Sequence, residues 1–114
     1  VVSAGHPSPI LLNTDGINEL AVLGRMPGIC EITSYNTKRI NLKSGERLLL
    51  FTDGFFDWAE DQHHKNEFFN AIYEIHKENI SQPLEQPSKR IYTTYKQFCD
   101  VPQDDMTFIL LEKK

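Results

Sequence analysis

Acidic residues stand at the ends of two strand-like segments of this 114-residue chain. Asp53 comes just after the apolar run RLLLF, and the adjacent Asp104 and Asp105 come just before MTFILLE. Aspartate is unfavourable inside strands and costly to bury unpaired. An aspartate at the end of a buried strand therefore usually hydrogen-bonds to a partner, binds a cation or forms part of a turn. Converging carboxylates repel one another unless a divalent cation lies among them, and oxygen ligands favour magnesium, manganese or calcium over zinc. The three aspartates would form half of such a site.

Each acidic segment also has a purely structural interpretation. Asp53 and Gly54 could form the turn of a hairpin that joins LLLF to FFDW, although the second segment does not alternate cleanly between apolar and polar residues. Asp104 and Asp105 could be solvated acids of an exposed loop. The spacing of the residues alone leaves both alternatives open.

The elements that would position these acids can be predicted from residue patterns. Segments 10–13 and 17–24 form a hairpin around an Asp-Gly turn. A second hairpin joins 40–42 to 47–51 through the Ser-Gly turn at 44–45. Because segment 47–51 is apolar on both faces, it is predicted to be a central, covered strand.

Helices are predicted between this central strand and the last strand. Apolar residues recur at helical spacing from 66 to 76, which indicates an amphipathic helix. Pro83 and Pro87 are predicted to end it, and a second helix follows with Ile91 and Tyr95 on one face. With strands first, then helices, then a final strand, the pattern predicts an α+β fold with helices gathered on one face of a mostly antiparallel sheet.

Composition narrows the classes of function. The chain is long enough for one compact core and carries a net charge of −4 without a Lys/Arg cluster, which argues against nucleic-acid binding. No apolar run approaches the roughly 20 residues of a membrane span, and the first residues do not resemble a signal peptide. Cys30 and Cys99 have no metal-ligand spacing and are typical of reduced thiols in a cytosolic protein. We therefore expect a cytoplasmic location.

Four ordered blocks resemble a known family. SAGHPSPILL, GRMPGI, SGERLLLFTDG and QDDMTFILLE resemble the later part of the PPM-type metal-dependent protein serine/threonine phosphatases, most closely the bacterial SpoIIE/RsbU branch. The resemblance runs from Val1 to Leu111. It implies part of an α/β/β/α sandwich, with two helices between the Asp53 strand and the final strand. It also implies that residues 1–114 are the C-terminal portion of a single phosphatase domain.

The resemblance assigns roles to particular residues. It implies two divalent cations, Mn²⁺ or Mg²⁺, one held by Asp53 and the other by Asp104, with water rather than a side chain attacking the phosphoester. Asp105 would orient its neighbour or a metal-bound water, and Gly54 would allow a sharp turn at the site. Arg25, in a glycine-rich loop, is a candidate phosphate contact. No catalytic residue beyond the metal ligands is expected.

The resemblance also implies a substrate, a phosphorylated regulatory protein such as an anti-anti-sigma factor. The family's metal-bridging aspartate would precede this segment, so we expect the segment alone to show little turnover and to self-associate through exposed apolar surface. The location would be the cytoplasm, or the cytoplasmic domain of a larger sensor protein. A non-catalytic phosphatase-like regulatory module is the alternative, and a small α+β interaction domain is a third. The presence of both Asp53 and Asp104 favours the enzyme.

Overall fold

The computed structural model of the chain describes residues 6–20, 39–100 and 105–114. Within these residues the chain forms strands, one short 3-10 turn and two long helices. In chain order they are β1 (Ile10–Asn13), β2 (Gly16–Glu19), β3 (Arg47–Phe51), η1 (Asp53–Phe55), α1 (Gln62–Glu78), α2 (Glu85–Phe98) and β4 (Phe108–Glu112).

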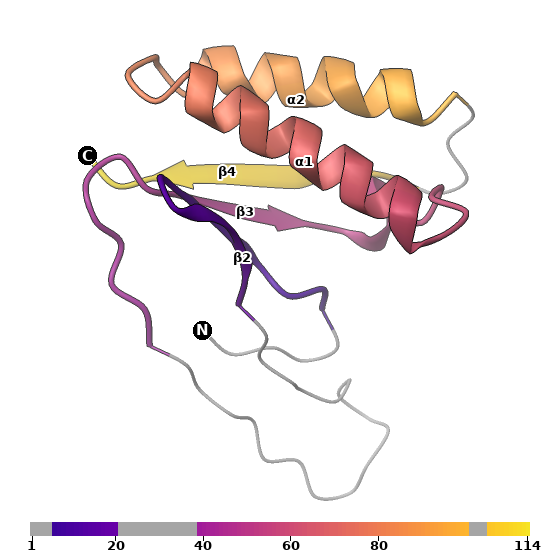
Figure 1. Cartoon of the computed structure of the whole chain (residues 1–114), viewed down its shortest axis with the longest axis horizontal. Coiled ribbons are helices and arrows are strands. Elements are labelled where there is room, and N and C mark those ends of the chain that lie inside the picture. Colours follow the sequence, from indigo (N-terminus) through magenta and orange to yellow (C-terminus); the bar gives the residue numbers. More distant parts are fainter. Residues whose placement is uncertain (1–5, 21–38, 101–104) are drawn as a thin grey trace, which may run out of the picture.

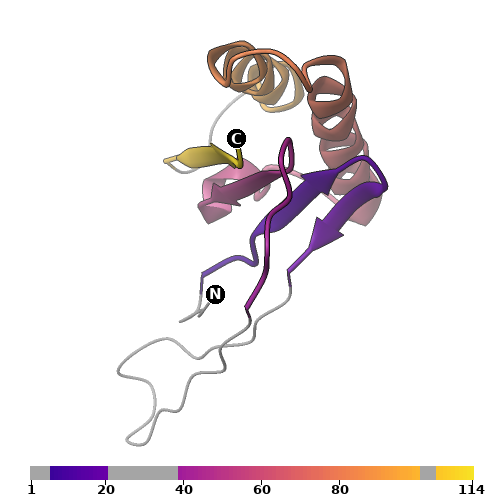
Figure 2. The same ribbon diagram turned by 90° about the vertical axis from the view of Figure 1, so that its left-hand side faces the viewer.

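The strands form one sheet in the order β2-β1-β3-β4, and every neighbouring pair is antiparallel. Helices α1 and α2 lie side by side over one face of this sheet (Figures 1 and 2). The described residues therefore form one sheet and one helix layer, which confirms the predicted α+β class. Strand β3 is central, as its apolar sequence predicted, because β1 and β4 occupy its two edges.

The first predicted hairpin is present as β1 and β2. Its turn is formed by Thr14 and Asp15, and the side chain of Asn13 accepts hydrogen bonds from the backbone N–H groups of Asp15 (2.9 Å) and Gly16 (3.0 Å). Gly16 pairs with Asn13 as the first residue of β2. The predicted second strand extended to residue 24, but residues 21–24 lie outside the described part of the chain.

The second predicted hairpin is wrong. Residues 40–42 form no strand, and β3 pairs instead with β1 and β4. A strand has only two edges, so once β1 and β4 are paired with β3 no edge remains for residues 40–42. The predicted turn at Ser44 and Gly45 is present, and Gly45 has φ of 87°, a left-handed conformation that favours glycine.

The two predicted helices are present, but the predicted role of the second proline is wrong. Asp61 caps the first helix by accepting a hydrogen bond from the backbone N–H of His64 (2.9 Å), and this helix ends at Glu78, before either proline. Pro87 does not end a helix. It lies in the first turn of α2, where a missing N–H costs no helical hydrogen bond.

The core lies between the helices and the sheet, and an aromatic residue of η1 occupies its centre. Phe55 is fully buried. Its ring centroid lies between 4.9 and 6.3 Å from those of Phe51, Phe68, Phe69, Tyr95 and Phe108. Because Phe68 and Phe69 belong to α1 and Tyr95 to α2, the turn that follows β3 is anchored to both helices and to the sheet.

Candidate metal centre

Asp53 lies where β3 ends and is the first residue of η1. Its side chain is exposed, and its backbone carbonyl accepts hydrogen bonds from the N–H groups of Phe56 (3.1 Å) and Asp57 (3.0 Å). Asp53 and Gly54 therefore begin a 3-10 turn that leads toward α1, and the alternative hairpin between LLLF and FFDW does not form. The N-cap residue of this turn is Thr52, whose side chain makes no capping hydrogen bond, and Asp53 is the acidic residue of its first turn.

Gly54 is the second residue of η1 and is buried. Its φ is not positive, since Gly16 and Gly45 are the glycines with positive φ in the described residues. The turn thus does not use the conformational freedom that we expected glycine to supply. What Gly54 contributes instead is the absence of a side chain at a buried position.

The pairing of β3 with β4 brings the two acidic segments to one end of the sheet. Phe51 is opposite Phe108 in the register, and the next pair, Thr52 and Thr107, is joined by a hydrogen bond from the Thr52 N–H to the Thr107 carbonyl (2.9 Å). Asp53 follows directly after this pair on one strand, and Asp105 stands two residues before it on the other. We call the end of the sheet formed by residues 52–53 and 105–107 the acidic sheet end.

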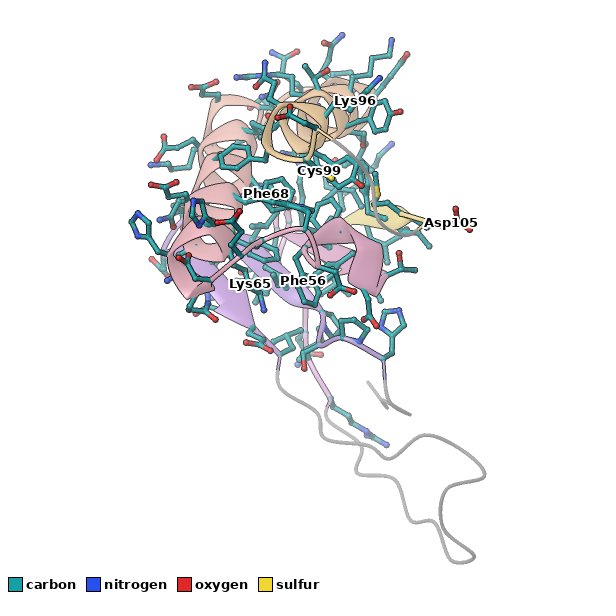
Figure 3. The ribbon with its side chains drawn as sticks, turned by 90° about the vertical axis from the view of Figure 1, so that its right-hand side faces the viewer. Phe56, Lys65, Phe68, Lys96, Cys99 and Asp105 are labelled. Carbon is teal, nitrogen blue, oxygen red and sulfur yellow. The ribbon has the colours of Figure 1, made fainter. Side chains whose placement is uncertain are left out.

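Asp105 is exposed, and Figure 3 shows its side chain at the rim of the sheet, away from the helices. Asp104 and Arg25, the other predicted site residues, lie outside the described residues. Within the described ranges no three ligating side chains come together as a metal site. The structure therefore places Asp53 and Asp105 at the same end of the sheet, and the roles of Asp104 and Arg25 stay predictions.

The donor set at the acidic sheet end suits a hard cation. Both described acids offer carboxylate oxygens, which are the preferred ligands of Mg²⁺ and Mn²⁺. No described histidine or cysteine joins them in a metal-binding cluster. The carboxylates of Asp53 and Asp105 lie beside the ends of two paired strands, and their role as metal ligands stays a prediction.

A hydrogen bond from a tryptophan supports the turn that carries Asp53. The indole N–H of Trp58 donates to the Phe55 carbonyl (2.9 Å), and the Trp58 ring contacts Phe68 and Phe98. Phe68 belongs to α1 and Phe98 to α2, so both helices support the turn from behind. The exposed acid thus stands on a backbone that is fixed by buried aromatic packing.

A surface cavity of about 260 Å³ opens beside this end of the sheet. Its apolar lining includes Ile10 and Phe51, and Lys65 contributes a cation. The Lys65 Nζ lies 4.2 Å from the centroid of the Phe56 ring, and the two side chains adjoin in Figure 3. Glu19 also lines the cavity, so its lining holds an acidic as well as a basic side chain among apolar ones.

The opposite end of β3 carries a buried charge that sequence reasoning missed. Arg47 is fully buried and pairs with Glu112 of β4 (3.1 Å), and its guanidinium donates to the backbone carbonyls of His76 (3.4 Å) and Asn79 (2.5 Å) at the end of α1. The pKa of His76 is lowered, chiefly because the imidazole is buried and secondly because the positive charge of Arg47 is close by. The negative charge of Glu112 acts in the opposite direction and raises this pKa. This cluster fastens helix α1 to the sheet far from Asp53.

Comparison with known proteins identifies the family and the fold. The family described as Stage II sporulation protein E (SpoIIE) matches residues 1–114. A structure of the PP2C phosphatase domain and a fragment of the regulatory domain of SpoIIE from Bacillus subtilis superimposes with a TM-score of 0.71 at 17% identity. A structure of RsbU and RsbW domains from Mycobacterium tuberculosis superimposes with a TM-score of 0.67 at 21% identity. No curated protein matches the sequence.

These similarities cover most of this chain and a minor part of each relative. Both structures align with 97% of this chain, which spans 32% of the chain from Bacillus subtilis and 31% of the chain from Mycobacterium tuberculosis.

Neither α1 nor α2 has the length and apolar character of a membrane-spanning helix, and the described residues contain no other candidate.

Proposed function

Because this chain belongs to the SpoIIE family, we propose that residues 1–114 form the C-terminal portion of a single metal-dependent phosphatase domain. The observation that carries the proposal is the register of β3 and β4, which brings Asp53 and Asp105 to one end of the sheet. A phosphatase-type function agrees with the PP2C phosphatase domain named for one solved relative. We further propose that the parent protein acts on phosphoserine or phosphothreonine.

The chain's own aspartates would hold two divalent cations, Mn²⁺ or Mg²⁺. Asp53 would bind one cation and Asp104 the other, while Asp105 would orient its neighbour. When bound, such cations lower the pKa of a water molecule and offset negative charge on the phosphoryl group, so no covalent enzyme intermediate is required. Arg25 would contact the phosphate group of the substrate.

The substrate that we propose is a phosphorylated regulatory protein such as an anti-anti-sigma factor, in the cytoplasm or at the cytoplasmic domain of a sensor protein. Two described features support a protein substrate. The acidic sheet end is open, since Asp53 and Asp105 are both exposed. The cavity beside it combines apolar side chains with polar and charged ones, Lys65 and Glu19 among them, which suits contact with a protein surface.

The 114-residue segment alone is proposed to be nearly inactive. Of the proposed ligands it contains Asp53, Asp104 and Asp105, and the metal-bridging aspartate would come from the preceding part of the domain. With fewer carboxylates, two dications would repel each other more strongly and bind more weakly. Turnover therefore requires the full-length protein.

Hydrolysis of p-nitrophenyl phosphate by the full-length protein with Mn²⁺ tests the proposal. Asp53→Asn keeps the size of the side chain and removes its charge, and we expect about a hundredfold loss of activity or more. Asp15→Asn is the matched control, because Asp15 lies in the β1–β2 turn, where asparagine is well tolerated.

Two results would oppose the proposal in different ways. If wild-type protein were silent with both Mn²⁺ and Mg²⁺, the phosphatase-like regulatory module would become the better account. If the wild type were active and Asp53→Asn equally so, the metal site would lie elsewhere.

A further inference from the structure

Strands β3 and β4 separate immediately after Thr52, and the hydrogen bonds at this point are unusual. In a regular hydrogen-bonded pair of antiparallel strands, the two residues exchange both backbone N–H···O bonds. The Thr52 N–H donates to the Thr107 carbonyl (2.9 Å), which is half of this exchange. The Thr52 carbonyl instead accepts from the N–H of Phe55 (3.0 Å), the bond that begins η1.

The side chain of Thr52 supplies the missing half of the pair. The Thr107 N–H donates to the Thr52 hydroxyl oxygen, Oγ1, at 3.0 Å. The hydroxyl in turn lies 3.4 Å from the Thr107 carbonyl, to which it donates a longer bond. The hydroxyl therefore extends the pairing of β3 and β4 by one residue on each side, to Thr52 and Thr107, while the backbone carbonyl of Thr52 turns away into η1.

This replacement occurs between the two acidic segments. Asp53 is the next residue after Thr52, and Asp105 is two residues before Thr107. Without the hydroxyl, one backbone hydrogen bond, from the Thr52 N–H to the Thr107 carbonyl, would remain between these two residues. The hydroxyl thus adds a second link between the residue before Asp53 and the residue two positions after Asp105.

We propose that Thr52 is a positioning residue of the metal centre, whose hydroxyl holds Thr107, and with it Asp105 two residues earlier, in place relative to Asp53. The inference rests on the proposed function, because it requires these aspartates to bind divalent cations. Thr52 does not itself touch the metal or the substrate in this scheme. It acts through the backbone of Thr107.

The test measures Mn²⁺ binding to the full-length protein by titration calorimetry, together with hydrogen exchange at the Thr107 amide. Thr52→Val keeps the shape of the side chain and removes the hydroxyl. We expect about tenfold weaker Mn²⁺ binding or more, as is typical when a group that supports a metal ligand is lost, and faster exchange at Thr107. Thr52→Ser retains the hydroxyl and should resemble the wild type.

A matched control and a second pair of variants make the test decisive. Thr93→Val alters an exposed threonine of α2 and should leave both readouts unchanged. If Thr52→Val does not fold, Thr52→Ala and Thr52→Ser differ by the hydroxyl alone, and only the alanine variant should lose affinity. Wild-type affinity in folded Thr52→Val or Thr52→Ala would overturn the inference. Absence of Mn²⁺ binding by wild-type protein would instead overturn the proposed function on which the inference rests.

Discussion

Two charged residues, Arg47 at the start of β3 and Asp53 just after its end, differ in burial. The buried residue has a structural role, whereas the exposed one is a candidate functional residue. Arg47 is fully buried and surrounded by acceptors, namely Glu112 and the last carbonyls of α1. Asp53 is exposed and lies in the first turn of η1. A buried charge needs its partners for stability, whereas an exposed acid on a rigid turn is free to bind a ligand.

Replacing Arg47 by methionine should destabilise the protein strongly. The change leaves Glu112 and the carbonyls at the end of α1 without their donor, and we expect the free energy of unfolding to fall by about 3–5 kcal/mol. Urea denaturation of the full-length protein measures the change. Arg90→Met is the control, because the Arg90–Glu78 pair is largely exposed and should contribute less than about 1 kcal/mol. Equal effects of the two substitutions would contradict the account of Arg47.

His76 should make stability depend on pH. Its pKa is lowered in the folded protein, chiefly by burial and then by Arg47, so the unfolded chain binds a proton at a higher pH than the folded one. Stability should therefore fall as the pH drops below about 6.5, the ordinary histidine pKa. The wild type should melt at a higher temperature than His76→Gln near neutral pH, and this difference should shrink as the pH is lowered below about 6.5. A difference that stays constant from pH 8 to pH 5 would refute this role.

At the scale of elements, the sequence predicted local structure better than strand pairing. The two helices were predicted because apolar residues recur at helical spacing, and β3 was predicted to be central because it is apolar on both faces. The partner of β3 was mistaken, since Ile40 and Leu42 alternate like a strand but β1 and β4 pair with it instead. Alternation indicates a strand-like segment, whereas long-range packing selects its partners.

The candidate site was predictable in part for the same reason. Asp53 and Asp105 stand next to strands that the sequence predicted, and the antiparallel pairing of these strands brings both acids to one end of the sheet. The role of Thr52 could not be predicted, because its hydroxyl is needed only where the backbone carbonyl turns into η1. The pairing of Arg47 with Glu112 was equally hidden, since the two residues are 65 positions apart.

The anchoring of η1 to the helices predicts a large effect of truncating its central ring. Phe55→Ala should lower the free energy of unfolding by about 3–5 kcal/mol, because Phe55 is fully buried among rings from both helices and the sheet. Calorimetry of the full-length protein measures this. Tyr92→Ala removes an aromatic ring from α2 that is 48% exposed, and its effect should stay within about 0.5 kcal/mol. A similar loss in both variants would show that Phe55 is not the anchor.

Among the described residues, the helices lie on one face of the sheet, and we call the other face the open sheet face. The helices cover the first (Figure 2), while Ile109 and Leu111 of β4 point to the other and are 53% and 46% exposed. Leu11, Leu48 and Leu111 align across neighbouring strands in the register, and of these Leu48 is buried while Leu111 of β4 is exposed. An apolar sheet face of this kind tends to associate with another surface.

The isolated 114-residue segment should therefore self-associate through the open sheet face. Light scattering at increasing concentration should show a mass above that of the monomer, and Leu111→Lys should shift it toward the monomer by placing a charge on this face. Ile80→Lys, which changes a partly exposed residue outside the sheet, should not. A monomer at high concentration in the unsubstituted segment would count against this prediction.

The central claim is that the acidic sheet end holds divalent cations, and anomalous X-ray scattering from crystals of the full-length protein grown with Mn²⁺ tests it most directly. We expect one manganese peak bonded to a carboxylate oxygen of Asp53 and a second bonded to Asp104, with the first absent in Asp53→Asn. Manganese peaks located only elsewhere, with Asp53 and Asp104 facing solvent, would contradict the account.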